Sequence, residues 1–207
     1  MVGRAKCLTV LGTTSSDRIT KRREATRREI LDAAWAVARD QGLGTLTLRE
    51  VATRVGMRPP SLYSHFESKD AIYDAMYGQA WQAFLELVRD RVLPAEPRAA
   101  LKEIASTFFD FAVADLARFQ LMNQRSVPGF VPSKESYAPA VEVIERLRRE
   151  LAMIGVRDEA GVDLFTALVG GLIDQQLAND PKGDRWRRLL DRVIDMYANE
   201  LKLRRRR

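Results

Sequence analysis

Few side chains in this sequence could carry out covalent or metal chemistry. The 207 residues include one histidine, His65, and one cysteine, Cys7. A nucleophile needs a base beside it, and a metal site needs several ligands at short spacing, but His65 has neither a second histidine nor a cysteine near it. The sequence also lacks a paired-carboxylate pattern and a glycine-rich phosphate loop. We therefore expect no catalytic residue, no metal site and no cofactor.

The residues around His65 are instead of the kinds that contact nucleic acid. From Arg58 to His65 the sequence offers a guanidinium, hydroxyl groups and an aromatic ring. Leu62 and Phe66 are apolar and lie four residues apart, which suits them to anchor one face of a helix. The remaining side chains of this segment can reach bases and phosphates.

The charge distribution agrees with a nucleic-acid partner for the first third of the chain. Residues 1–70 carry 13 Lys and Arg against 8 Asp and Glu, whereas residues 71–203 carry 17 against 20. Four arginines, Arg204–Arg207, end the sequence and are interpreted as a solubilising tail. A basic module on a near-neutral body favours a polyanion as the partner of that module.

Short helices must position these side chains. Apolar residues at helical spacing predict a first helix over about 25–41. Thr47 and Glu50 form a capping-box pattern that starts a second helix. We expect Gly56 to end this helix because a side chain would clash at a tight crossing. A third helix is predicted over about 59–65, and the whole has the layout of a DNA-binding helix-turn-helix, whose second helix enters the major groove.

The rest of the chain also has helical periodicity, without strand-like alternation. Turn signals separate six further helices. They are expected at about 69–92, 97–114, 115–125, 135–154, 159–178 and 184–202.

One segment makes the sequence similar to a known family. Leu62 to Lys69 reads LYSHFESK, which follows the pattern LY-x-HF-x-x-K of the TetR family of repressors. Gly42, the capping box and Gly56 precede it in the expected order, and the resemblance runs from about Arg28 to Met76. It implies an all-α chain with a three-helix helix-turn-helix DNA-binding domain and a larger helical ligand-binding and dimerisation domain. The corresponding boundaries are a mobile N-terminal extension (1–20), the DNA-binding domain (21–68), the helical body (69–203) and a basic tail (204–207).

The resemblance also implies roles for individual residues in DNA binding. Two successive prolines depart from the usual small or polar pair, so base reading there would be apolar, against a thymine methyl. The basic run before the first helix has two interpretations, a solvated face or a DNA-contacting arm. The DNA-binding candidates are Thr47 and Lys69 at phosphates; Arg58, Pro59, Pro60 and Ser61 at the leading edge of the recognition helix; Tyr63, Ser64 and His65 along that helix; and Arg27 and Arg28 in the arm.

The body contains many large apolar residues, and the resemblance implies that some of them line a ligand cavity. The alternative for each is ordinary core, and for the polar residues it is an exposed surface. The ligand candidates are Trp81, Phe84, Phe108, Phe109, Phe111, Phe119, Met122 and Asp174. Further polar residues that could orient a ligand are Asn123, Gln124, Arg125, Gln175 and Gln176.

The two C-terminal helices have apolar stripes that are wide for a body of this size. Gly170 and Gly171 would allow a close approach between helices, so a two-fold dimer through a four-helix interface is expected. The interface candidates are Phe165, Leu168, Val169, Leu172, Ile173, Trp186, Leu190, Ile194 and Tyr197.

Taken together, these features predict a homodimeric repressor that binds a near-palindromic double-stranded DNA operator and is released by a small apolar effector. With one cysteine and no apolar run of about 20 residues, we expect a cytoplasmic protein without a membrane partner. The apolar stretch from Cys7 to Leu11 is too short for the core of a signal peptide. Two alternatives remain, a DNA-binding regulator without a ligand and a small helical enzyme. A filled core would favour the first of these, and the lack of a reactive constellation disfavours the second.

Overall fold

A computed structural model describes residues 15–203, with side chains from Asp17 onward. Within that range every regular element is helical, which confirms the all-α prediction. Short 3-10 helices at Leu43–Thr45 and Arg187–Leu189 accompany the α-helices. The α-helices are α1 (Ser15–Gln41), α2 (Leu48–Val55), α3 (Pro59–Tyr63), α4 (Lys69–Arg89), α5 (Pro97–Val113), α6 (Leu116–Asn123), α7 (Lys134–Met153), α8 (Glu159–Asn179) and α9 (Leu190–Glu200).

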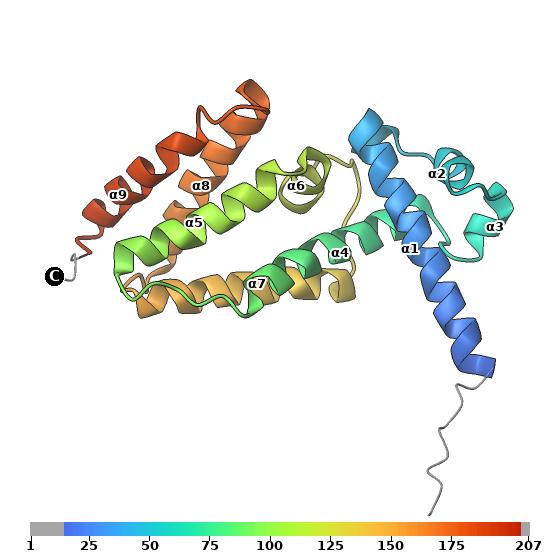
Figure 1. The fold of residues 1–207 in the computed structure, drawn as a ribbon, viewed down its shortest axis with the longest axis horizontal. Helices are drawn as coiled ribbons and strands as arrows, with labels where there is room; N and C mark the ends of the chain where they lie inside the picture. Colours follow the sequence, from blue (N-terminus) through green and yellow to red (C-terminus); the bar gives the residue numbers. More distant parts are fainter. Residues whose placement is uncertain (1–14, 204–207) are drawn as a thin grey trace, which may run out of the picture.

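The first helix is longer than predicted. It begins at Ser15 rather than near residue 25, so residues 15–20 belong to α1 and not to an irregular extension. Residues 21–24, which read KRRE, are charged and have good helix propensity, so this section of the added part can be helical without an apolar stripe. Figure 1 shows the start of α1 projecting past the helices that follow it. The rest of the predicted extension, residues 1–14, and the basic tail 204–207 lie outside the described residues.

The last predicted helix is shorter than expected and starts at Leu190. The residues before it contact the side chain of Gln176, which is buried in α8. Its Oε1 accepts from the backbone N–H groups of Trp186 at 2.9 Å and Arg187 at 3.1 Å, and its Nε2 donates to the carbonyl of Gly183 at 3.1 Å. Because one amide satisfies these backbone groups, the connection between α8 and α9 is held in a compact turn.

Helices α1 to α3 form one end of the molecule, and α4 leads from it into the body (Figure 1). The core of this end contains Ile30 of α1, Leu62 of α3 and Phe66, together with Ile72 and Tyr73 from the first turns of α4. The first part of α4 is therefore packed with the helix-turn-helix.

Helix α7 lies along α4 in the body. The carboxylate of Asp74 accepts hydrogen bonds from the hydroxyls of Ser133 and Ser136, both at 2.8 Å, which fixes the start of α7 to α4. A Cβ at Gly78 would lie 3.2–3.3 Å from Ser136, so a glycine permits this close approach.

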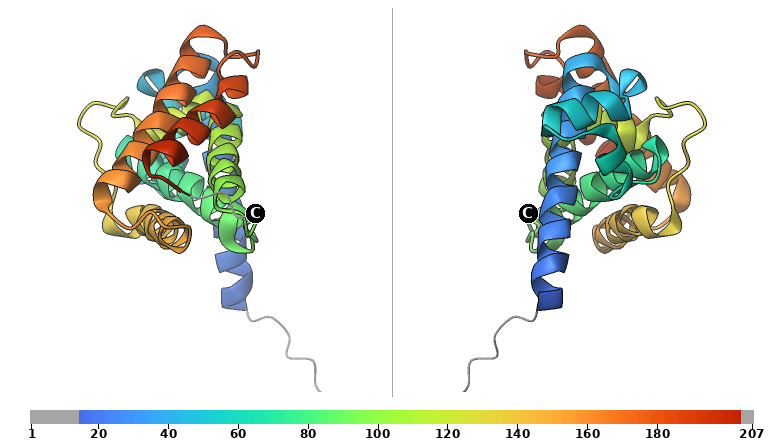
Figure 2. Two further views of the ribbon diagram at one scale, coloured as in Figure 1. Left: turned by 90° about the vertical axis from the view of Figure 1, so that its left-hand side faces the viewer. Right: turned by 90° about the vertical axis from the view of Figure 1, so that its right-hand side faces the viewer.

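A second core joins α5, α8 and α9. It includes Phe109, Phe165, Ile194 and Tyr197, and the Tyr197 hydroxyl donates to the carbonyl of Gly161 at 2.8 Å. In Figures 1 and 2, α8 and α9 (orange and red) run next to each other, and in Figure 1 α5 separates α9 from α7. No helix of the described residues is long and apolar enough to cross a membrane.

Candidate DNA-binding surface and ligand cavity

The turn between α2 and α3 depends on Gly56. Its φ is +76°, in the left-handed region, and its N–H bonds to the carbonyl of Thr53 at 3.1 Å. A Cβ placed on Gly56 would meet no atom within 4 Å. The expectation of a steric clash was therefore wrong, because glycine is required here for its backbone conformation and not for space.

The start of α2 shows half of the predicted capping box. The Thr47 hydroxyl accepts from the N–H of Glu50 at 3.2 Å, as expected of an N-cap. The Glu50 carboxylate accepts from the side-chain amide of Gln41 on α1. Thr47 itself is exposed at the end of the helix, where its hydroxyl can approach a phosphate.

The recognition helix α3 is held by two buried residues, Leu62 and Phe66, and exposes its other side chains. It ends at Tyr63 rather than residue 65, and the Ser64 hydroxyl donates to the carbonyl of Ser61 at 2.7 Å. Tyr63 is 54% exposed. The other exposed candidates in this segment are Arg58, Pro59, Pro60, Ser61 and Ser64.

His65 differs from the other candidates in this segment. It is half-buried, and its Nδ1 is buried without a hydrogen-bond partner within the described residues. Its carbonyl accepts from the guanidinium of Arg27, which lies over the Phe66 ring at 4.0 Å from the centroid. Arg23 donates to the carbonyl of Ser64 at 3.1 Å. Arg27 and Arg23 therefore bind the C-terminal end of the recognition helix, a role that their sequence pattern did not indicate.

The remaining DNA-binding candidates flank this unit. Arg28 is exposed on α1. Lys69 is the first residue of α4 and is half-buried, with its Nζ 5.5 Å from the centroid of the Tyr73 ring. Ser68 caps the helix, since its hydroxyl accepts from the N–H of Ala71 at 3.0 Å. The cap places Lys69 at a helix N-terminus, where backbone N–H groups and a lysine suit a phosphate.

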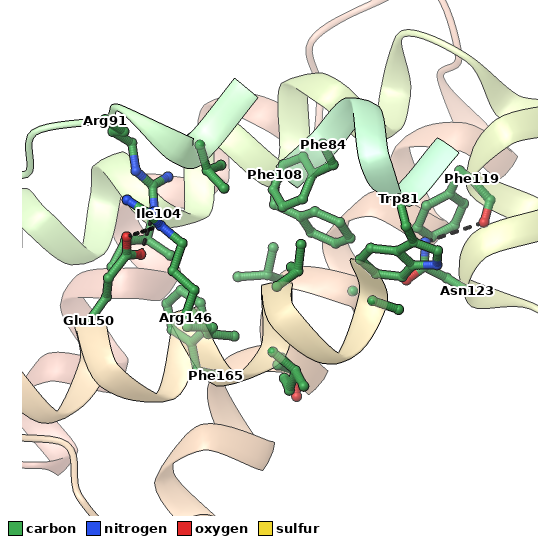
Figure 3. A pocket seen from close by; sticks show the side chains of 18 of the residues that line it. Trp81, Phe84, Arg91, Ile104, Phe108, Phe119, Asn123, Arg146, Glu150 and Phe165 are labelled. Carbon is green, nitrogen blue, oxygen red and sulfur yellow. Dashed lines mark hydrogen bonds and ion pairs between the residues drawn. The ribbon is translucent and has the colours of Figure 1, made fainter. Parts of the chain in front are cut away.

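The body contains a cavity of about 320 Å³ between helices α4 to α8. This volume lies at the lower end of the range of about 300–1,000 Å³ found for ligand pockets. Phe84 and Phe108 meet edge to face, with ring centroids 5.2 Å apart, and form part of its apolar wall. Figure 3 shows Trp81 and Asn123 at one end of this wall, and Arg91, Arg146 and Glu150 at the other.

The structure brings five of the eight ligand candidates to the cavity. Trp81, Phe84, Phe108, Phe119 and Asp174 line it, as do the suggested polar residues Asn123 and Gln124. The prediction was wrong for three residues that lie elsewhere. Phe109 is buried in the core of α5, α8 and α9; Phe111 packs beneath the guanidinium of Arg118; and Met122 is buried in the core around α1 and α4.

The charged end of the cavity was missed by the sequence analysis. Glu150 follows Leu147 and precedes Leu151 and Ile154, so it occupies a position in the apolar stripe of α7. A charged residue at a position expected to be buried was the signal in the sequence that could have indicated this site, because a buried carboxylate needs a charged or hydrogen-bonding partner. No such signal marks Arg91, which lies in the connection after α4.

The predicted dimer interface needs correction. Seven of its nine residues are buried within a single chain, where they fill the core of α5, α8 and α9 or face the cavity. A side chain already buried in its own chain cannot bury further surface against a partner. The seven are Phe165, Val169, Leu172, Ile173, Leu190, Ile194 and Tyr197; Leu168 and Trp186 remain partly exposed.

The helix-turn-helix and the helical body that follows it define a DNA-binding transcription regulator. Residues 30–76 match the tetR family of bacterial regulatory proteins. The helix-turn-helix of this chain is therefore of the tetR-family type. The members of the family are transcription regulators and not enzymes, which excludes the enzyme alternative.

Three similar proteins illustrate this relationship. The HTH-type transcriptional repressor Rv1474c of Mycobacterium tuberculosis (strain ATCC 25618 / H37Rv) is 26% identical over 180 residues, which cover 86% of this chain and 94% of that protein. The structure of the regulatory protein SCO4313 has a TM-score of 0.71 at 21% identity and covers 87% of this chain and 98% of that one. FadR from Bacillus subtilis, solved in complex with stearoyl-CoA, has a TM-score of 0.55 at 17% identity, with 82% and 96% covered.

Proposed function

We propose that this regulator is a repressor, which binds a near-palindromic operator as a homodimer in the cytoplasm and leaves it when a small apolar molecule enters the cavity. The relation to a named repressor, Rv1474c, supports the sign of regulation. FadR from Bacillus subtilis, which shares this fold, was solved in complex with stearoyl-CoA, and this supports a small-molecule ligand for this chain.

The observation that carries this proposal is that α4 belongs to both parts of the molecule. Near its start, Ile72 and Met76 are fully buried in the core shared with α1 and α3, and the Tyr73 hydroxyl donates to the carbonyl of Leu43. Further along, Trp81 and Phe84 line the cavity. A ligand that displaces these two rings therefore acts on a helix whose first turns share a core with the recognition helix.

The dimer would form through the outer faces of α8 and α9. Leu164 of α8 is 41% exposed and Met196 of α9 is 61% exposed, although both are large apolar residues. A Cβ atom at the exposed Gly171 would meet nothing within 4 Å, so this part of α8 is open to a close helix partner. A two-fold axis here would present the two recognition helices to successive major grooves, about 34–36 Å apart.

The test begins with selection of bound DNA from a random pool, which supplies an operator, and a ligand screen for its release. The affinity of the protein for a ligand found in this screen is then measured in the presence and in the absence of operator DNA. Coupling is reciprocal, so operator should weaken ligand binding by the factor by which the ligand weakens DNA binding, about 5- to 150-fold. Equal affinities would favour the ligand-independent regulator, and a reporter gene behind the selected operator distinguishes repression from activation.

A further inference from the structure

Three charged side chains form a connected group at the end of the cavity away from the DNA-binding domain. Arg91 Nη2 lies 2.5 Å from Glu150 Oε2, and Arg146 Nε lies 2.8 Å from Glu150 Oε1. Arg146 also donates to the carbonyl of Arg89 at 3.0 Å. All three line the cavity, and Figure 3 shows them together.

This group carries one positive charge more than its carboxylate neutralises. The side chains of Arg91, Arg146 and Glu150 are 11%, 24% and 7% exposed, so water compensates the excess poorly. Arg91 Nε is buried and has no hydrogen-bond partner within the described residues. A second anion would neutralise the group and accept a hydrogen bond from Arg91 Nε, which otherwise has no acceptor.

A second cluster of similar composition, outside the cavity, has no such excess of positive charge. Arg98 and Lys102 both pair with Asp195, but Lys102 also lies 3.6 Å from Asp191. Two cations there meet two carboxylates. In the cavity, the other acidic lining residue, Asp174, accepts from Gln124 at 2.9 Å and lies on α8.

An apolar wall runs from the charged group toward Trp81. Trp81, Phe84 and Val88 follow one another on one face of α4, at intervals of three and four residues. The rise of an α-helix places the first and last about 10 Å apart. Phe108 of α5 and Phe165 of α8 line the same space. The cavity is therefore complementary to a molecule with an apolar body and one anionic end.

We infer that the effector is an elongated apolar carboxylate, with its carboxylate at Arg91 and Arg146 and its apolar part along α4 toward Trp81. This inference rests on the proposed function, in which the cavity holds the effector. A purely structural role of the three charges, joining the end of α4 to α7, is the reading that the experiment must separate from it.

The experiment measures the binding of decanoate, 1-decanol and decylamine to the full chain by calorimetry, below micelle-forming concentrations. Decanoate should bind at least tenfold more tightly than 1-decanol, and decylamine most weakly. Shortening decanoate to nonanoate should weaken binding about fourfold, the effect of one buried methylene. Arg91→Met should weaken decanoate binding about ten- to hundredfold, as expected for the loss of a charged hydrogen bond, and leave 1-decanol within threefold.

Matched variants keep this result interpretable. Lys102→Met removes one positive charge outside the cavity and should leave decanoate binding unchanged. Arg146→Met repeats the test at the second guanidinium, and circular dichroism establishes that each variant is folded. Equal binding of decanoate and 1-decanol, equal loss of both in Arg91→Met, or no binding of decanoate would overturn the inference. If 1-decanol alone bound and released operator DNA, the proposed function would stand without the anionic site.

Discussion

The guanidinium of Arg27 lies over the ring of Phe66, 4.0 Å from its centroid, and donates to the carbonyl of His65. Phe66 is one of the two buried residues that anchor the recognition helix. A residue of α1 thus stabilises the end of a helix that lies nearly forty positions further along the chain.

Replacing Arg27 should destabilise the fold by loosening the C-terminal end of the recognition helix. Arg27→Ala should lower the free energy of unfolding by about 1–3 kcal/mol, since it removes a charged hydrogen bond and a cation–π contact. Arg28→Ala removes an exposed neighbour and should leave stability within about 0.5 kcal/mol. Chemical denaturation of both variants checks this. Equal stabilities would contradict the role assigned to Arg27, even if both variants bound DNA weakly.

Lys69 and Tyr63 should contribute to DNA binding without contributing to folding. Lys69→Ala should weaken operator binding and lower the slope of log affinity against log salt by about one, because one phosphate contact is lost. Tyr63→Ala should weaken binding with intact helicity. Lys182→Ala, an exposed lysine in the turn after α8, makes the same charge change away from the helix-turn-helix and should leave the slope unchanged. An unchanged slope in Lys69→Ala as well would remove this residue from the binding surface.

A charge on the outer face of α8 should separate the proposed dimer. Leu168→Arg places a guanidinium at a partly exposed position between Leu164 and Gly171, where it would be desolvated in the interface. Sedimentation velocity at micromolar concentration should show a dimer for the wild type and a monomer for this variant. Met153→Arg, at a 76% exposed position at the end of α7, is the control and should remain dimeric. A wild-type monomer would exclude the proposed assembly altogether.

Tyr197 should make stability depend on pH in the alkaline range. Burial, with a smaller effect of the Asp158 charge, raises the pKa of Tyr197 to about 12. The pKa of a tyrosine in the unfolded chain is about 10. Because the pKa of Tyr197 is higher in the folded state, its contribution to the free energy of unfolding is complete below pH 10 and is lost as the pH rises from 10 to 12. Tyr197→Phe should lose about 1 kcal/mol at pH 8, from the missing hydrogen bond to Gly161, and fall less steeply above pH 10. Parallel curves for variant and wild type would show that Tyr197 does not cause the alkaline loss.

The sequence alone determined the helix-turn-helix, because its signals are local. Thr47 caps the start of α2 because its hydroxyl accepts from the N–H of Glu50, three residues further on. Gly56 ends that helix because its backbone adopts the left-handed conformation. Leu62 and Phe66 anchor α3 at a spacing that one helix turn dictates. Each of these residues acts on neighbours within a few positions, so the type and order of residues were sufficient to predict the element.

Only the tertiary structure decided which buried residues form the core and which face the cavity. An apolar stripe indicates that one side of a helix is buried, but the side that a neighbouring helix covers depends on how helices far apart in the sequence pack. Phe109 and Phe108 are adjacent in α5, yet the first fills the core and the second lines the cavity. Phe165 and Val169 carry the stripe expected of a dimer interface, but α5 and α9 bury them inside one chain. The pairing of Arg91 with Glu150 joins residues 59 positions apart, and no local pattern could have shown it.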